Sequence, residues 1–323
     1  MKLTSGSCVD GSRSPVVFLM GPTASGKTEI ASRLFEHMEC ELVSVDAAQV
    51  YRGMNIGTAK PDAEFLARTP HHLIDIRKIS ETYSAADFSR DANRLIADII
   101  RRRRVPVLVG GTMFYFSALE QGLSALPAAD PVLRMQVRQE VREHGLAVLY
   151  EELAAADRET ACRLSPADSQ RIQRAIEVLR LTGVPPSQLM HRARNALEQP
   201  VIKLAVFAGD RGILHHQIGE RFRAMLELGL VEEVRALAAE PGFAASLPAL
   251  RSVGYRQVLA YLDGKVSYSA MVENGQAATR QLAKRQLTWL RNQSNLVWFE
   301  NSQPKVVESM IDFLRGTMEL GPR

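Results

Sequence analysis

Short apolar runs and helical repeats alternate along the first third of the chain. Mostly apolar runs of strand length occur at Val16–Met20, Glu41–Val45 and Val105–Val109. Between them, Thr28–Met38 and Tyr83–Arg104 carry apolar residues at the three- and four-residue spacing of an amphipathic helix. Apolar strands that alternate with helices are typical of a parallel sheet covered on both faces. The pattern therefore predicts a doubly wound α/β core with a parallel sheet.

The pattern changes near Gly122 and changes back near residue 201. From 122 to 200 we find no clear strand, and the apolar spacing predicts helices at Pro131–His144, Leu146–Ala156 and Ser169–Thr182. Strand patterns return at Val201–Ala208 and at Leu296–Phe299. We therefore expect a core that is interrupted by a helical insertion domain.

The expected domain boundaries follow from these changes. A discontinuous catalytic core is predicted for residues 15–121 and 201–323, with the helical insertion at 122–200. Residues 1–14 are polar and rich in Ser and Gly, without the apolar segment of a signal peptide, and are predicted to be a disordered extension. A length of 323 residues agrees with about two domains.

The composition indicates the compartment and the partners to expect. No apolar run approaches the roughly 20 residues that span a bilayer, so we expect no membrane association. The three cysteines, Cys8, Cys40 and Cys162, are scattered and show no metal-binding spacing. They suit a reducing compartment, and we expect a cytoplasmic, monomeric protein. A net charge of +4 and a pI of about 9.0 permit a nucleic-acid partner without requiring one.

A phosphate-binding motif follows the first predicted strand. The motif G-x-x-x-x-G-K-[ST] is matched by Gly21, Pro22, Thr23, Ala24, Ser25, Gly26, Lys27 and Thr28. In this motif, backbone N–H groups and the start of the next helix face the phosphate oxygens. Lys27 supplies a cation, and Thr28 is a candidate Mg²⁺ ligand. The motif predicts phosphate binding but does not specify the reaction.

The strand ends suggest chemistry other than that of an ATPase. The Val105–Val109 strand runs into glycines where an ATPase or kinase carries a metal-binding Asp. Asp46 ends the earlier strand and would face the ligand crevice at the carboxyl edge of the sheet. Asp46 is therefore a candidate metal ligand or general base, and a helix N-cap is its alternative structural role.

The phosphate loop is the first of several motifs that follow one another along the chain. They are GPTASGKT at 21–28, VDAAQVYR at 45–52, IGTAKP at 56–61, VGGT at 109–112, DSQRIQRA at 168–175, RSVGYR at 251–256 and TRQLAKRQLTWLR at 279–291. In this order they closely resemble the tRNA dimethylallyltransferase (tRNA isopentenyltransferase) family over about residues 16–300. The resemblance implies transfer of a dimethylallyl group from dimethylallyl diphosphate, with Mg²⁺, to N6 of the tRNA adenosine 3′-adjacent to the anticodon, position 37.

The resemblance also implies roles for particular residues. Asp46 would take the proton from N6, and Lys27, Thr23 and Arg221 would act on the diphosphate. The predicted tRNA-binding residues are Asp46, Ala47, Ala48, Gln49, Thr112, Arg134, Gln170, Arg171, Ile172, Gln173, Arg174, Arg251, Ser252, Val253, Gly254, Tyr255 and Arg256. Ala47 departs from the family pattern, which has Ser at this position.

Three other functions fit parts of the sequence. A small-molecule kinase or ATPase could be built on the same loop, although the strand that ends at Val109 lacks the expected Asp. An enzyme that prenylates free AMP, ADP or ATP would share the catalytic core. An RNA-binding protein with an inactive phosphate loop is disfavoured because Lys27, Thr28 and Asp46 are all present. The insertion and the basic helix near residues 280–291 favour a tRNA anticodon stem-loop as the acceptor.

Overall fold

The fold was analysed in a computed structural model, which describes residues 14–124, 126–190, 193–194, 196–240, 243–244 and 247–319. The chain divides into two compact units, one formed by residues 1–120 and 197–323 and the other by Gln121–Ala196. We call them the core unit and the inserted unit. The predicted disordered extension, residues 1–14, lies outside the described residues except for Ser14.

The core unit contains a six-stranded sheet in which every paired strand is parallel. The strand order is β3-β2-β4-β1-β7-β8. The strands are β1 (Val16–Met20), β2 (Cys40–Val45), β3 (His71–His72), β4 (Val105–Gly110), β7 (Val201–Phe207) and β8 (Leu296–Glu300). The α/β fold class expected from the sequence is confirmed. The short strand β3 was not predicted, because two histidines carry no apolar signal.

The helices of the core unit include the two predicted for the first third of the chain, with slightly different ends. They are α1 (Lys27–His37), α2 (Ala63–Arg68), α3 (Ala85–Arg101), α4 (Met113–Gln121), α10 (Arg211–Glu227), α11 (Leu230–Ala238), α12 (Tyr255–Leu262), α13 (Tyr268–Arg291) and α14 (Val306–Glu319), with a 3₁₀ turn at Ala249–Arg251. Helix α3 begins at a capping box, in which Ser84 and Asp87 each bond the other's backbone N–H.

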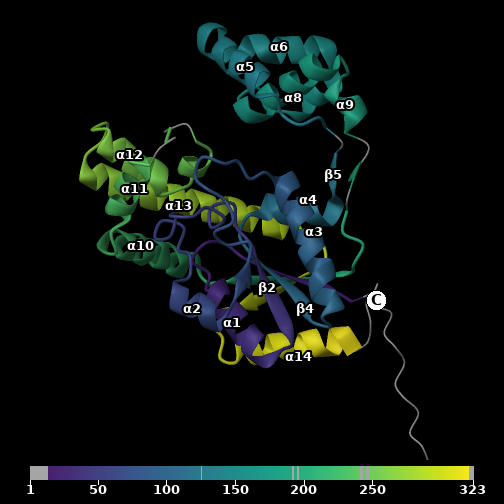
Figure 1. Ribbon diagram of the computed structural model, residues 1–323, viewed down its shortest axis with the longest axis vertical. Coiled ribbons are helices and arrows are strands. Elements are labelled where there is room, and N and C mark those ends of the chain that lie inside the picture. The colour runs from purple at the N-terminus through teal and green to yellow at the C-terminus, as the bar shows by residue number, and fades with distance from the viewer. Residues whose placement is uncertain are drawn as a thin grey trace, which may run out of the picture. The chain divides into compact units, whose positions relative to one another are not determined.

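Alternate residues of the central strand β1 point into two separate apolar cores. Val17 and Leu19 pack with residues of α1 and α14, which lie side by side on one face of the sheet (Figure 1). Phe18 and Met20 pack on the opposite face, with residues of α3, α4 and the later helices. Burial on both faces explains why β1 is apolar at every position.

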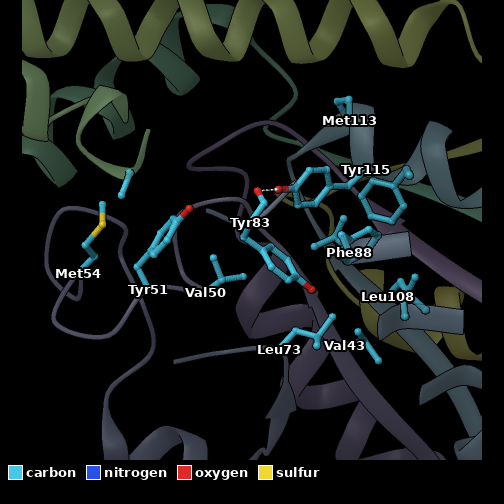
Figure 2. Close-up of a cluster of buried hydrophobic side chains, with 14 of the residues drawn as sticks. Val43, Val50, Tyr51, Met54, Leu73, Tyr83, Phe88, Leu108, Met113 and Tyr115 are labelled. Carbon is cyan, nitrogen blue, oxygen red and sulfur yellow. Dashed lines mark hydrogen bonds between the residues drawn. The ribbon is translucent and has the colours of Figure 1, made fainter. Parts of the chain in front are cut away.

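The second core also fixes the loops that precede α3. Figure 2 shows Tyr51, Val50 and Met54 of this loop region gathered near Tyr83, Phe88 and Tyr115. The rings of Phe88 and Tyr115 are stacked with centroids 4.7 Å apart. The Tyr115 hydroxyl donates to the carbonyl of Tyr83 over 3.0 Å, so a buried polar group is satisfied. These contacts hold the chain that follows Asp46 against the sheet.

The inserted unit is a helical bundle with its own apolar core. Its helices are α5 (Pro131–His144), α6 (Leu146–Ala156), α7 (Arg158–Arg163), α8 (Ser169–Thr182) and α9 (Pro186–Leu189). Val137, Leu149 and Ile172 are among the residues buried between them. A pair of two-residue antiparallel strands, β5 (Leu123–Ser124) and β6 (Ala193–Arg194), is also present. These strands were not predicted.

The unit boundary differs from the predicted insertion at 122–200. Residues 197–200 belong to the core unit, since the N–H of Leu197 donates to the carbonyl of Leu119 and the carbonyl of Pro200 accepts from Val16. These backbone bonds extend the core to the start of β7. Among the described residues, no helix is long and apolar enough to cross a membrane.

Candidate active site

The carboxyl ends of β1, β2 and β4 open into one cavity of about 680 Å³ in the core unit. The lining contains residues from both predicted groups, the diphosphate site and the acceptor site. Those predicted residues that line it are Thr23, Ala24, Lys27, Thr28, Asp46, Ala47, Ala48, Gln49, Thr112, Arg221, Arg251, Ser252, Val253 and Gly254. A site at the carboxyl edge of a parallel sheet follows the general rule for open α/β folds.

The Gly21–Thr28 loop joins β1 directly to the start of α1. Gly26 has a φ of 79°, the left-handed conformation that favours glycine, and it is the residue immediately before the helix. The first N–H groups of α1 therefore follow a sharp turn at the cavity. A helix N-terminus of this kind attracts an anion through its free N–H groups and dipole.

The side chain of Lys27 contacts other residues of its own loop. Its Nζ donates to the carbonyl of Pro22 over 2.6 Å and lies 3.4 Å from Ser25 Oγ. The pKa of Lys27 is lowered to about 7, mainly by burial and then by the nearby positive charge of Arg221, whereas the charge of Asp46 opposes the shift. An anionic ligand in the cavity would favour the charged form of Lys27 and so raise this pKa.

Arg221 reaches the same cavity from α10, which is distant in sequence from the loop. Burial lowers the pKa of Arg221, and the carboxylate of Asp46 partly offsets this effect. Asp46 thus lies close enough to Lys27 and Arg221 for its charge to raise the pKa of each. Two half-buried cations and one half-buried carboxylate therefore line one cavity at the end of the sheet.

Asp46 uses one carboxylate oxygen to fix the chain that follows β2. Its Oδ1 accepts from the N–H of Ala48 over 2.8 Å and from that of Gln49 over 3.1 Å. Among the described residues, no hydrogen bond is recorded to its Oδ2. Asp46 can therefore hold the backbone with Oδ1 and still use Oδ2 for chemistry.

Gln49 and Thr112 make contacts within the protein. Ser44 donates to Oε1 of Gln49 over 3.2 Å, and Nε2 of Gln49 lies 3.3 Å from the carbonyl of Thr58. The hydroxyl oxygen of Thr112 accepts from the N–H of Ala47 over 3.0 Å, which leaves the hydroxyl hydrogen available as a donor. Thr112 thereby holds the backbone beside Asp46, at the position where the family pattern has Ser.

The RSVGYR stretch, residues 251–256, is divided between surface and interior. Arg251 is exposed and lines the cavity, whereas Tyr255 is fully buried and donates from its hydroxyl to Glu233 over 2.5 Å. Arg256 is exposed but lines a different, smaller hollow. Within this stretch, Arg251 is the side chain best placed to meet a ligand of the cavity.

The predicted tRNA-binding residues of the inserted unit surround a buried acid. Arg134 forms a two-pronged ion pair with Glu177, whose carboxylate also pairs with Arg174 at 3.3 Å. Ile172 is fully buried in the bundle core, whereas Gln170 and Arg171 are exposed. The ion pairs orient Arg134 and Arg174, and both keep about a third of their side chains exposed, 39% and 31%. A tRNA-binding role for these residues stays a prediction.

Two residues that hold the loops around the cavity were not singled out in the sequence. Gln286 of α13 lines the cavity and bonds the loops after β1 and β4. Glu233 of α11 accepts hydrogen bonds from the N–H groups of Asn55, Ile56 and Gly57. A polar residue within the buried stripe of a helix was the available signal for Gln286, because Ala283 and Leu290 on either side are buried.

The residues of the cavity fit a magnesium ion that is shared with a substrate. Among the described residues, no three His, Cys, Asp or Glu side chains cluster as a metal site. Mg²⁺ does not require such a cluster, since it keeps several waters and binds one or two protein oxygens together with phosphate oxygens. The hydroxyl of Thr28 and the carboxylate of Asp46 both line the cavity and supply oxygens of this kind.

Comparison with known proteins agrees with this arrangement. The sequence matches the IPP transferase family over residues 49–293. The chain belongs to this family. It is 57% identical over 278 residues to the tRNA dimethylallyltransferase of Thiobacillus denitrificans, covering 86% of this chain and 89% of that protein. It is 50% identical over 305 residues to the tRNA dimethylallyltransferase of Alkalilimnicola ehrlichii, covering 94% and 96% of the two chains.

Two solved structures share the fold. The full-length tRNA isopentenylpyrophosphate transferase of Bacillus halodurans superposes with a TM-score of 0.70 at 33% identity, covering 95% of this chain and 98% of that one. A eukaryotic dimethylallyltransferase acting on tRNA superposes with a TM-score of 0.77 at 23% identity, covering 96% and 80%. This second likeness concerns the fold alone.

Proposed function

We propose that this protein is a tRNA dimethylallyltransferase that uses dimethylallyl diphosphate. The C1–O bond of the donor breaks, a bond forms between C1 and N6 of the adenosine at tRNA position 37, and diphosphate leaves. One proton departs from N6. The observation that carries the proposal is the meeting of Lys27, Arg221 and Asp46 in one cavity of a member of the IPP transferase family.

The cationic side of the cavity suits the leaving group. Negative charge grows on the diphosphate as the C1–O bond breaks, and fixed positive groups stabilise such a transition state. Lys27, Arg221 and the first N–H groups of α1 supply these groups. Thr28 would hold a Mg²⁺ ion together with phosphate oxygens and water, and the ion would supply further charge neutralisation.

Asp46 is suited to remove a proton from the adenosine acceptor. The N6 amine of adenine is a poor nucleophile because its lone pair is delocalised, so removal of a proton as the new bond forms lowers the barrier. Oδ1 of Asp46 is held by two backbone N–H groups, which leaves Oδ2 to accept that proton. The hydroxyl of Thr112, anchored beside Asp46, can donate to the base.

A tRNA acceptor must present its base outside the stack. An enzyme that reacts with a nucleobase extrudes it into a pocket and binds the neighbouring backbone with cationic groups. Arg251 and Arg285 line the cavity and are exposed, which suits phosphate contacts around its entrance. Free AMP would engage few of these outer groups.

The decisive experiment is mass spectrometry of tRNA nucleosides after incubation with dimethylallyl diphosphate and Mg²⁺. We expect N6-dimethylallyladenosine at position 37 of an unmodified tRNA, and much less product from AMP. Product from AMP alone would indicate an adenylate prenyltransferase. Phosphate release from ATP without any prenylated product would favour a kinase or ATPase, and either result would overturn the proposal.

A further inference from the structure

Gln286 connects two loops at the carboxyl edge of the sheet. Its Oε1 accepts from the N–H of Thr23 over 2.9 Å, and its Nε2 donates to the carbonyl of Gly111 over 2.7 Å. Thr23 lies in the loop after β1, and Gly111 follows β4. One amide from α13 therefore sets the separation of two loops that lie 263 and 175 residues away in the sequence.

The surroundings leave this amide little freedom. Only 8% of Gln286 is exposed, so both of its polar atoms need partners within the protein. A Cβ atom on Gly111 would lie 2.5 Å from Nε2 of Gln286, closer than real Cβ contacts allow. Glycine at this position lets the amide approach the backbone, and the two residues fit each other as a pair.

The connection continues to the proposed base. Thr112 follows Gly111, and its hydroxyl oxygen accepts from the N–H of Ala47, next to Asp46. Its own N–H donates to the carbonyl of Val45 over 3.2 Å. Gln286 thus stands between the loop that would hold the diphosphate and the segment that would meet the adenosine.

We propose that Gln286 is a positioning residue, which aligns the Thr23 loop and the Gly111–Thr112 turn for group transfer. This inference rests on the proposed function for its chemistry. The N–H of Thr23 is bonded to the protein, so Gln286 fixes the loop without competing for the phosphate. A misplacement of reacting groups by about 1 Å can lower a rate about 100-fold, so an amide that sets their spacing controls the reaction.

The first test uses inorganic pyrophosphate with Mg²⁺ as the ligand and requires no transfer. Gln286→Met preserves the length of the side chain and removes both hydrogen bonds. We expect the dissociation constant of pyrophosphate from this variant, measured by calorimetry, to rise about tenfold, because the Thr23 loop loses its hydrogen bond to α13. Gln281→Met is the matched control, since Gln281 lies on the same helix, is exposed and does not line the cavity. An unchanged affinity in folded Gln286→Met would overturn the inference.

A second variant tests the same contact while Gln286 itself is unchanged. Gly111→Ala keeps Gln286 but places a methyl group against its amide, and we expect it to weaken pyrophosphate binding in the same way. The thermal unfolding temperature of each variant is measured in parallel. If Gly111→Ala binds pyrophosphate as the wild type does, Gln286 does not act through this contact, and the inference fails.

The third test is a double-mutant cycle on transfer. Thr23→Val keeps the backbone N–H that bonds Gln286 but removes the hydroxyl that this loop would present to the diphosphate. We expect Gln286→Met to lower kcat/KM for dimethylallyl diphosphate about 30-fold, with the KM for tRNA unchanged. The loss should be only about fivefold in a Thr23→Val background, where the hydroxyl to be positioned is absent. A general loosening of the fold would give the same loss in both backgrounds and would overturn the positioning role. If the wild type bound pyrophosphate but formed no prenylated tRNA, the proposed function would fail, while the pyrophosphate comparison would still decide the role of Gln286.

Discussion

Asp46 combines a structural and a chemical task at the scale of a single residue. Its Oδ1 holds two backbone N–H groups in the manner of a cap, so replacement by Ala would change the backbone as well as the chemistry. Asn retains a side-chain oxygen for these two bonds but cannot take a proton. The structure therefore identifies Asn as the informative substitution.

We expect Asp46→Asn to lower kcat by about 100- to 10,000-fold, the usual contribution of a general base. The affinity for tRNA and the unfolding temperature should stay close to those of the wild type. Single-turnover transfer and tRNA binding are the measurements. Asp62→Asn is the control, because Asp62 caps α2 through the same kind of bond and does not line the cavity. Survival of kcat within a few-fold would remove Asp46 as the base.

Lys27 makes diphosphate binding dependent on pH. Its pKa of about 7 in the free protein means that Lys27 is charged below pH 7 and largely neutral above it. A bound diphosphate favours the charged form and raises the pKa, so binding takes up protons from about pH 7 upwards, and affinity falls as the pH rises.

Calorimetric titration with pyrophosphate, in buffers of different ionisation enthalpy, measures this proton uptake. Pyrophosphate also titrates, so the comparison with Lys27→Arg isolates the lysine, because arginine stays charged throughout. We expect the wild type to take up more protons than Lys27→Arg at about pH 8. Equal uptake by the two proteins would show that Lys27 is charged before the ligand binds.

At the scale of elements, α11 holds the loop that forms one wall of the cavity. The carboxylate of Glu233 accepts from three consecutive N–H groups, those of Asn55, Ile56 and Gly57, and from the hydroxyl of Tyr255. Gly57 and Thr58 line the cavity. Glu233 therefore ties a long loop after β2 to the helices that follow β7.

We expect Glu233→Ala to lower the free energy of unfolding by about 2–4 kcal/mol, because several partly buried donors lose their acceptor. Urea unfolding provides the measurement. Glu232→Ala is the neighbouring control, since Glu232 is exposed and pairs with Arg235 on the surface, and its loss should cost at most about 0.5 kcal/mol. Equal effects of the two substitutions would contradict the anchoring role.

Sequence patterns predicted the elements but not the contacts that join them. Val16–Met20 is apolar throughout and was predicted as a strand with the correct ends, and the three main helices of the inserted unit were predicted with theirs. The bonds of Gln286 and Glu233 to backbone groups could not be predicted, because they join segments more than 170 residues apart and use groups that any residue possesses. Long-range bonds of this kind leave no local periodicity.

Arg221 could be predicted from the family resemblance but not from the local sequence pattern. Its helix shows no feature that distinguishes a site arginine from a surface arginine, and only the family resemblance indicated a role. The structure places Arg221 at the cavity, and its role there stays a prediction. Arg221 is one turn from the buried Ile218 and adjacent to the buried Phe222, so its side chain extends into the cavity beside the core.

At the scale of the whole molecule, positive charge is distributed over both units. Arg251 and Arg285 belong to the core unit, whereas Arg171 belongs to the inserted unit, and all three are exposed. Contacts between such groups and phosphates release counterions from the nucleic acid, so affinity falls steeply with salt.

We expect a steep linear decrease of the logarithm of tRNA affinity with the logarithm of the salt concentration. Arg251→Gln and Arg171→Gln should each reduce the slope by about 1. Arg68→Gln is the control, because Arg68 is exposed on α2 outside the predicted tRNA-binding stretches. Filter binding over a range of salt concentrations measures the slope, and a flat response would contradict the assignment of these stretches.

The position of β1 has a consequence for synthesis on the ribosome. On one side β1 pairs with β4, which is complete at residue 110, but on the other side it pairs with β7, at residues 201–207. The whole inserted unit is therefore translated before the central strand gains its second neighbour. Until then, one edge of a strand that is fully buried in the finished protein stays unpaired, and an unpaired apolar edge favours aggregation. Rapid folding of the inserted unit, which has its own core, would shorten the effective distance between these two strands and protect the nascent chain.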